Sequence, residues 1–328
     1  TIGAPQIGRI APERTLEFSG ADVKATANVR KLYYATFVNS GVRNPIAKNN
    51  TESALYVYST LGGENVGLQA TVSPADDSAF YAQGSLVKKI SAGNNGGLAQ
   101  ATIVDNDFDG AIDVAYAGDF RCNLYRFDLR GAVSQWKVTR IFTTINNRPI
   151  TAAPAVVRND KNHYVVVFGT GSDLYQADLN NKDTQSVYGI YDDLTQENPE
   201  PVISNQLLQQ TLTAPQFRGD YNQRDLSKLT FDKNQHRGWF FNLTEGTGER
   251  VVVKPTTLLK TIVLTTRQYS VNKTADNNNS TATDVCVPSS ETSSTTASSW
   301  LMQFRSDTGG KLPEEGEKDA DMFGYIDV

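Results

Sequence analysis

A three-part pattern of short apolar runs repeats along the sequence and limits the folds that this chain can adopt. Each unit begins with a small residue or proline before β-branched residues, as in "AQATIV" (99–104) and "APAVV" (153–157). A second apolar run follows, and then a third run with an aromatic residue and a turn, such as "NLYRFDLRG" (123–131). Short runs rich in Val, Ile, Thr and aromatic residues, bounded by Gly, Asn and Asp, are typical of β-strands.

This repeat predicts an all-β fold, a modified β-propeller with quinoprotein-like blades. A unit of three or four strands cannot cover both faces of its own sheet, so neighbouring units must stack face to face around an axis. About five units can be counted, and the less regular one ends in "GWFFNLTEGTG" (238–248). The run "LYRFDLRGAVSQW" (124–136) has the residue order of quinoprotein-type blades, so we expect the indole of Trp136 to lie between blades. A β-sandwich would also contain short strands and turns, but the fixed order of the three runs favours the propeller.

We interpret residues 1–328 as a single propeller domain that is the C-terminal part of a longer protein. The sequence begins at "TIGAPQIG" without a methionine, so the lack of a signal peptide says nothing about location. Two segments are expected to be loop insertions, near 66–95 and near 270–299. The second is rich in Ser, Thr and Asn and has few apolar residues to bury, which predicts a mobile loop.

Charge and composition exclude some classes of function. The formal net charge is -5 at pH 7, whereas non-specific nucleic-acid binding needs a basic surface. No apolar run approaches the roughly 20 residues of a membrane-spanning helix. The two cysteines, Cys122 and Cys286, belong to no CxxC pair and give no support to a zinc or redox site. They could form one long-range disulfide or remain two thiols.

The segment "DNDFDGAID" (105–113) places four aspartates around one glycine, and this pattern predicts a calcium site. Asp105, Asp107 and Asp109 occupy the first, third and fifth places of a calcium loop, and the glycine the sixth. The carbonyl of Ala111 falls at the seventh place and Asp113 at the ninth. Hard oxygen ligands at this spacing suit Ca²⁺ better than zinc or copper. A bound cation would offset the repulsion between the four carboxylates.

The match to an EF-hand is incomplete. The twelfth place, normally a bidentate glutamate, is Tyr116, and strand-like apolar runs flank the loop instead of helices. Asp113 would then have to close the site, together with water. The plain alternative is an acidic, solvated hairpin turn, in which Asp and Gly are common. Four carboxylates in register with a glycine favour calcium over this alternative.

Other motifs are weaker. Arg218, Gly219 and Asp220 form an RGD tripeptide that could engage an integrin, although a polar turn is its commoner meaning. The only histidines, His163 and His236, lie in no recognisable triad or metal spacing. We therefore predict that the chain is not an enzyme and has no catalytic residues.

One long segment identifies a family resemblance. "GGLAQATIVDNDFDGAIDVAYAGDFRCNLYRFDLRG" (96–131) resembles the C-terminal domain of the PilC/PilY family of type IV pilus biogenesis factors and tip adhesins. The aspartate loop, "YAGD" and "YRFDL" occur in the family's order, and "ITAAPAV" (150–156) and "VVFGTGSDL" (166–174) continue it. The similarity covers nearly the whole chain and is closest to the neisserial PilC-like branch.

The resemblance implies a modified seven-bladed propeller with a calcium loop on one blade. Because only about five units can be counted here, the chain could be a fragment of such a ring. The family's calcium ligands match Asp105, Asp107, Asp109, the carbonyl of Ala111, and Asp113. The sequence departs from the family pattern at Cys122, where relatives often have glycine, and in the expanded segments 9–30 and 66–95.

The resemblance also implies a function. We expect a calcium-binding domain of a type IV pilus biogenesis and tip protein that controls pilus extension against retraction and supports host-cell adhesion. Its partners would be pilus components such as minor pilins, and a host-cell receptor. It would be exported to the outer membrane or periplasm, or to the bacterial cell surface at the pilus tip.

Two other functions stay open. One is a propeller that binds carbohydrate or protein and is merely stabilised by calcium. The other is a quinoprotein-type dehydrogenase, although such enzymes assemble their calcium and cofactor sites from several blades, unlike a local hairpin loop.

Overall fold

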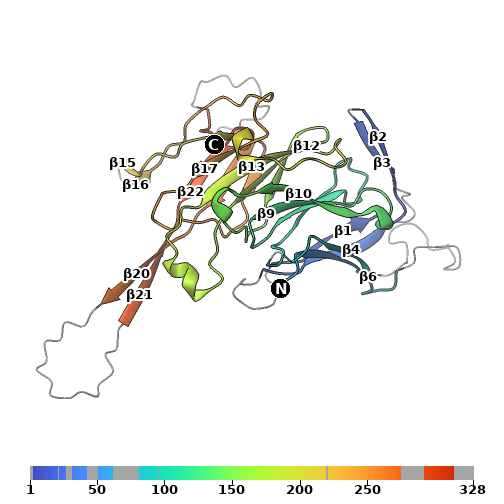
Figure 1. Cartoon of the computed structure of the whole chain (residues 1–328), viewed down its shortest axis with the longest axis horizontal. Coiled ribbons are helices and arrows are strands. Elements are labelled where there is room, and N and C mark those ends of the chain that lie inside the picture. The colour runs from blue at the N-terminus through green and yellow to red at the C-terminus, as the bar shows by residue number, and fades with distance from the viewer. Residues whose placement is uncertain are drawn as a thin grey trace, which may run out of the picture.

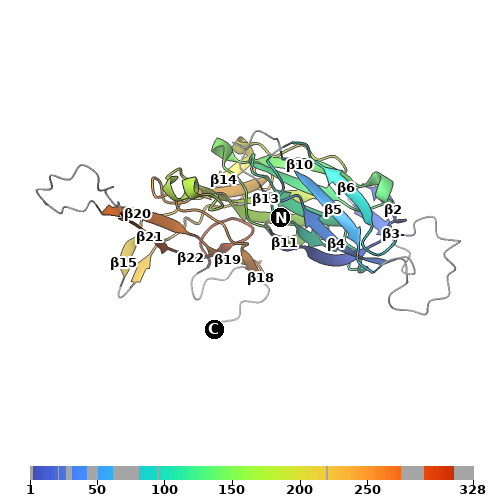
Figure 2. The same cartoon turned by 90° about the horizontal axis from the view of Figure 1, so that it is seen from below.

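The computed structural model describes residues 3–20, 22–26, 32–42, 51–61, 81–94, 96–218, 221–274 and 292–313. Its regular structure is almost entirely β-strand, with helical residues only in short 3₁₀ turns among these described residues. Four sheets, which we call the first to fourth blades, follow one another along the molecule (Figures 1 and 2). The predicted all-β propeller-type fold is confirmed.

The first three blades each contain a four-stranded antiparallel sheet. The first is β1 (Gln6–Ile10), β4 (Tyr33–Asn39), β5 (Ala54–Ser59) and β6 (Leu86–Ser91). The second is β7 (Thr102–Val104), β8 (Val114–Gly118), β9 (Asn123–Asp128) and β10 (Lys137–Thr143). The third is β11 (Ala155–Asp160), β12 (His163–Gly169), β13 (Ser186–Asp193) and β17 (Gly238–Asn242), to which β14 (Leu207–Gln209) adds in parallel.

The fourth blade has three strands: β18 (Thr256–Leu258), β19 (Thr261–Thr265) and β22 (Leu301–Arg305). Three separate hairpins complete the strands: β2 (Thr15–Ser19) with β3 (Asp22–Thr26), β15 (Gln216–Arg218) with β16 (Tyr221–Gln223), and β20 (Gln268–Thr274) with β21 (Thr292–Ser298). The 3₁₀ turns are η3 (Val133–Gln135), η4 (Ile145–Asn147), η5 (Gln176–Asn180) and η6 (Ser204–Gln206).

Apolar side chains between neighbouring blades form the core. The first strands of the blades lie in a row, β1 beside β7, β7 beside β11, and β11 beside β18. One cluster joins the first and second blades and includes Phe37, Phe127 and Trp136. A second cluster joins the second and third blades, and a third, around Trp239, joins the third and fourth. Trp136 therefore lies between two blades, as predicted.

The number of blades in the structure differs from the number of units predicted from the sequence. The segment "GWFFN" is not a unit of its own but the fourth strand of the third blade, where Trp239 lies opposite Gly189 of β13. The sequence predicts one unit too many because this strand is apolar on both faces and therefore resembles the start of a new unit. Both faces are apolar because the sheet is covered on both sides.

The predicted insertions are partly ordered. β6, which lies within 66–95, is the outer strand of the first blade, whereas residues 62–80 lie outside the described residues. The ends of the Ser/Thr-rich segment pair as β20 and β21, from Gln268 opposite Ser298 to Thr274 opposite Thr292. Backbone pairing between β20 and β21 forms this hairpin, although its sequence has few apolar side chains to bury. Residues 275–291 lie outside the described part.

None of the described helices is long and apolar enough to cross a membrane.

A close packing contact in the third blade gives a test of the core. A Cβ at Gly189 would lie 2.2 Å from the indole of Trp239, which is fully buried and donates from Nε1 to the Ser306 carbonyl. We expect Gly189→Ala to lower the free energy of unfolding by about 1–3 kcal/mol, because the methyl group overpacks the sheet.

Urea unfolding of Gly189→Ala, of Trp239→Leu and of the double variant measures this contact. The double variant should lose less than the sum of the single losses, since the smaller side chain makes room for the methyl group. Additive losses, or an unchanged stability of Gly189→Ala, would contradict the packing described here.

Candidate metal centre

The aspartate-rich segment is the loop between the first two strands of the second blade. β7 and β8 pair antiparallel with Val104 opposite Val114, so residues 105–113 close the connection. Gly110 has a φ of 91°, in the left-handed region that glycine tolerates best. A Cβ at this position would lie 2.0 Å from a guanidinium nitrogen of Arg9. The glycine therefore permits both the turn and the close approach of the arginine.

Three of the four aspartates converge. Asp105, Asp107 and Asp109 each bring one carboxylate oxygen within 4.8 Å of the others. The loop winds around these groups, since Asp105 accepts a hydrogen bond from the N–H of Gly110 (2.9 Å) and Asp109 one from the N–H of Ala111 (2.8 Å). Each carboxylate oxygen has a further lone pair, so these bonds orient the groups and leave them able to bind a cation.

The fourth aspartate is held differently. Asp113 is buried, and one of its oxygens accepts a hydrogen bond from the N–H of Asn106 (2.6 Å). Its other oxygen contacts the guanidinium of Arg14, and the carboxylate is not part of the group of three. Burial raises the pKa of Asp113 to about 6, and the charge of Arg14 opposes that rise. The predicted role of Asp113 as a calcium ligand stays a prediction.

Two arginines that the sequence analysis did not single out contact the loop. Arg14, between β1 and β2, is buried, and its Nη2 lies 3.1 Å from Asp109 Oδ1. Arg9, in β1, donates from Nε to the carbonyl of Gly110 at 3.0 Å. These contacts join residues 95 and 101 positions apart in the sequence. The only signal in the sequence is the uncompensated charge of the loop, which calls for a cation but does not say which one.

Asn106 connects the loop to the third blade. Its Nδ2 donates to Oδ1 of Asn162 (2.8 Å), and its Oδ1 accepts from the hydroxyl of Tyr164 (3.0 Å). Its carbonyl accepts a hydrogen bond from Nη1 of Arg158 (3.1 Å). The loop therefore contacts the first blade through the two arginines and the third blade through Asn106.

These residues fit a calcium ion. The donors are hard oxygens, which calcium prefers. Ala111 is buried, and no hydrogen bond between described residues uses its carbonyl, which is the oxygen that the sequence predicts as a ligand. Desolvation, followed by the charge of Asp109, raises the pKa of Asp107, as in carboxylates whose shared charge is not fully compensated. The contact between Arg14 and Asp109 offsets part of that charge.

The other predicted sites fall only partly within the described residues. Arg218 ends β15, but Gly219 and Asp220 lie outside, so the integrin-type motif stays a prediction. Cys122 is buried and forms no disulfide with a described residue, while Cys286 lies outside the part of the chain that the structure describes, so a disulfide between them is untested. Burial raises the pKa of a Cys122 thiol to about 11, so the reduced cysteine is protonated at neutral pH.

Comparisons with known proteins agree on one family. The family model of the PilY1 β-propeller domain matches residues 25–216. A type IV pilus biogenesis factor PilY1 homologue of Xylella fastidiosa is 27% identical over 207 residues, covering 53% of this chain and 14% of the relative. The type IV pilus biogenesis factor PilY1 of Pseudomonas aeruginosa strain UCBPP-PA14 is 34% identical over 173 residues, covering 40% of this chain and 15% of the relative.

A solved structure shows the same fold. The crystal structure of the Pseudomonas aeruginosa PilY1 C-terminal domain is similar with a TM-score of 0.62 at 19% sequence identity. The similarity covers 94% of this chain and 62% of that chain. The matches to the Xylella fastidiosa and Pseudomonas aeruginosa relatives described above cover only a small part of the length of each relative.

The buried ion pair beside the loop can be tested by substitution. We expect Arg14→Leu to lower the free energy of unfolding by about 3–5 kcal/mol, because it leaves the carboxylate of Asp113 buried without its partner. Adding Asp113→Leu should recover part of the loss, since the double variant buries no charge there, although the N–H of Asn106 then lacks its acceptor. Urea unfolding followed by tryptophan fluorescence measures all three proteins.

Arg9→Gln is the matched control, because it removes a charge beside the same loop. Among the described residues, the guanidinium of Arg9 bonds to the carbonyl of Gly110 and forms no ion pair with the loop. Its cost should stay near the roughly 1 kcal/mol of an ordinary hydrogen bond. Equal losses in Arg9→Gln and Arg14→Leu, or a double variant no more stable than Arg14→Leu, would contradict the assignment.

Proposed function

Because this chain belongs to the PilY1 β-propeller domain family, we propose that it is the calcium-binding propeller of a type IV pilus biogenesis factor. The two relatives described above are type IV pilus biogenesis factors. One observation supports calcium above all others: the carboxylates of Asp105, Asp107 and Asp109 converge within 4.8 Å in a loop that presents hard oxygens. Minor pilins and other pilus components would be its partners.

Each residue of the loop would have a distinct role. Asp105, Asp107, Asp109 and the carbonyl of Ala111 would hold the ion, whose charge offsets the repulsion between the carboxylates. Asp113 closes the base of the loop by accepting from the N–H of Asn106 (2.6 Å), which keeps the chain turned back toward β8. The loop residues thus need little rearrangement to present their oxygens together.

Asp109 would couple calcium binding in the loop to the contact with Arg14. Its carboxylate contacts Arg14 at 3.1 Å and also belongs to the group of three, so the same carboxylate pairs with a guanidinium and would bind the calcium ion. A ligand shifts an equilibrium only through different affinities for two states. Occupancy of the loop would therefore change the contact of Asp109 with the segment that leads from β1 to β2.

A partner that binds the surface beside the loop would respond to this change in the contact of Asp109. Phe108, at the tip of the loop, is 75% exposed, and the guanidinium of Arg158 lies 5.0 Å from its ring centre. We infer that a pilus component contacts this surface, and that the calcium state of the loop thereby biases extension against retraction. Host-cell adhesion through Arg218, Gly219 and Asp220 is a separate part of the proposal.

Calcium binding is tested by replacing the three converging carboxylates. The combined variant Asp105→Asn, Asp107→Asn, Asp109→Asn should lose the binding heat seen on titration of CaCl₂ into the wild type, because amide oxygens carry no charge. Calcium at a hundred times its Kd should stabilise the wild type by about 2.7 kcal/mol and leave the variant unchanged. Asp183→Asn, which removes an exposed carboxylate paired with Arg148, is the control and should bind normally.

The regulatory part is tested in cells that carry these substitutions in the full-length protein. Pilus retraction should respond to added calcium with the wild type and the control, and should not respond with the triple variant. If the triple variant loses calcium but retracts like the wild type, the ion only stabilises a binding propeller, and the control of retraction is rejected. Retained calcium binding in the triple variant would reject the site itself.

A further inference from the structure

The fourth blade has one strand fewer than the other three. In those blades the third strand, β5, β9 or β13, is covered on its outer side by a fourth strand, β6, β10 or β17. In the fourth blade β22 occupies the third place, and no further strand pairs with it among the described residues. The outer edge of β22 is thus where a fourth strand would lie.

The hydrogen bonds around β22 show which backbone groups face this edge. The carbonyl of Trp300 accepts from the N–H of Thr266 (2.9 Å), and the N–H of Ser306 donates to the carbonyl of Lys260 (2.7 Å). Even-numbered residues of β22 therefore bond to β19. Because bonded sides alternate along an antiparallel strand, the backbone groups of Leu301 and Gln303 point outward.

These outward groups are available for pairing. No hydrogen bond between described residues uses the N–H or carbonyl of Leu301 or Gln303. The next outward residue, Arg305, is already paired, since its N–H donates to the carbonyl of Gly310 (3.0 Å) and its carbonyl accepts from the N–H of Gly309 (3.0 Å). Two consecutive outward residues of an edge strand thus lack partners in the described part.

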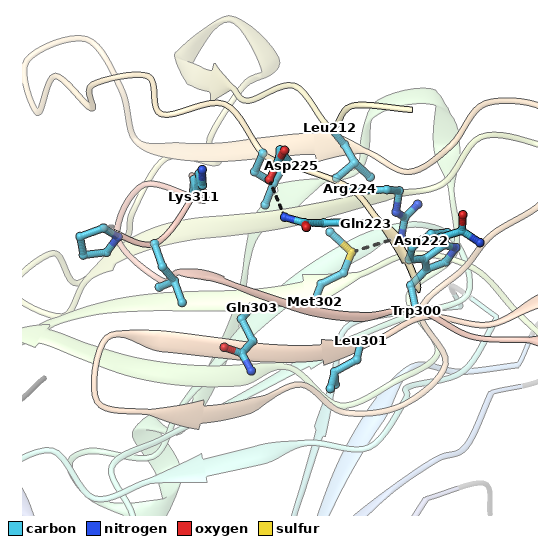
Figure 3. Close-up of a pocket in the computed structure, with 13 residues that line it drawn as sticks. Leu212, Asn222, Gln223, Arg224, Asp225, Trp300, Leu301, Met302, Gln303 and Lys311 are labelled. Carbon is cyan, nitrogen blue, oxygen red and sulfur yellow. Dashed lines mark hydrogen bonds between the residues drawn. The ribbon is translucent and has the colours of Figure 1, made fainter. Parts of the chain in front are cut away.

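A pocket of about 430 Å³ runs along this edge. Figure 3 shows Leu301, Met302 and Gln303 on one side of it and Arg224 and Asp225 on the other. Its lining also includes apolar side chains from both sides, and Leu301 is 67% exposed. An open sheet edge beside a partly apolar groove can accept an added strand, whose main chain bonds to the edge while its side chains fill the groove.

The chain itself arrives at this pocket. Residues 311–313 line it, but the N–H of Lys311 donates to the carbonyl of Ser227 (3.1 Å) and Pro313 has no N–H, so this stretch does not cover the edge. The sequence continues for 15 residues past Pro313. Seven of them, 314–320, are mostly acidic and include a glycine, and they provide enough length to turn back toward β22.

The last eight of these residues read as a strand. In "DMFGYIDV" (321–328), Met322, Ile326 and Val328 share one side of an extended chain, and Phe323 and Tyr325 share the other. This two-sided apolar pattern matches β17, "GWFFN", the fourth strand of the third blade. The segment 314–328 also carries six acidic residues, and Lys311 lines the pocket. The other basic residue of the lining, Arg224, is already paired with Glu249 (2.6 Å).

We propose that residues 321–328 add to the outer edge of β22 and complete the fourth blade. The N–H and carbonyl groups of Leu301 and Gln303 pair with the added strand. Its apolar side chains fill the pocket beside Met302. This inference does not depend on calcium binding.

Hydrogen exchange at single-residue resolution in the full chain tests the proposal. The N–H of Leu301 should exchange roughly tenfold or more slowly in the wild type than in Ile326→Asp, because the charge prevents the added strand from packing. Lys318→Ala, which lies before the strand-like segment, is the control and should match the wild type. The N–H groups of Met302 and Phe304 bond to β19, so their exchange should be equal in all variants and report an intact sheet.

A second pair of variants acts on the edge itself. Gln303→Pro removes the outward N–H and should speed exchange at Leu301 as much as Ile326→Asp does, whereas Gln303→Ala should not. A peptide of residues 320–328, added to Ile326→Asp, should restore the slow exchange, and a scrambled peptide should not.

Two results would overturn the proposal. One is equal exchange of the Leu301 N–H in the wild type and in Ile326→Asp. The other is protection that increases with protein concentration and accompanies a dimer in light scattering, because the strand would then come from a second copy of the chain.

Discussion

Burial of apolar side chains between neighbouring sheets holds the four blades together and places every other feature of the molecule. The contact between the third and fourth blades shows how. The rings of Trp239 and Phe304 lie 5.6 Å apart at 83°, and those of Phe241 and Phe304 lie 5.3 Å apart at 86°. Such edge-to-face pairs contribute about 0.5–1.5 kcal/mol beyond the area they bury. A blade without its neighbour would expose these rings to water.

Buried polar groups add direction to this packing. The hydroxyl of Tyr116 donates to Oδ2 of Asp192 (2.7 Å), and Nη1 of Arg126 lies 3.1 Å from Oδ1 of the same carboxylate. All three side chains are buried at the seam between the second and third blades. A buried carboxylate needs such partners to offset its lost hydration, so this contact favours the register in which the two blades meet. The aspartate loop contacts the third blade through Asn106, so this contact depends on how the second and third blades pack.

Local features of this fold can be predicted from the sequence, whereas features assembled from distant segments cannot. The run "LYRFDLRGAVSQW" places a strand, a turn and an interblade tryptophan within a few residues, and all three are found in the structure. The spacing of Asp105, Asp107 and Asp109 predicts that their oxygens converge, because a turn around Gly110 leaves them little choice. The pairing of Arg14 with Asp113 has no such signal, since it depends on how the first blade packs against the second.

The β20–β21 hairpin is a projecting arm that can transmit force to the blades. It extends away from the blades (Figure 1), and its seven residue pairs, at about 3.4 Å each, make an arm roughly 20 Å long. Its base continues directly into β19 and β22, and Arg267 anchors it to Asp173 at 2.8 Å. A sideways force on the hairpin would therefore be transmitted both to the last blade, through β19 and β22, and to the loop that contains Asp173.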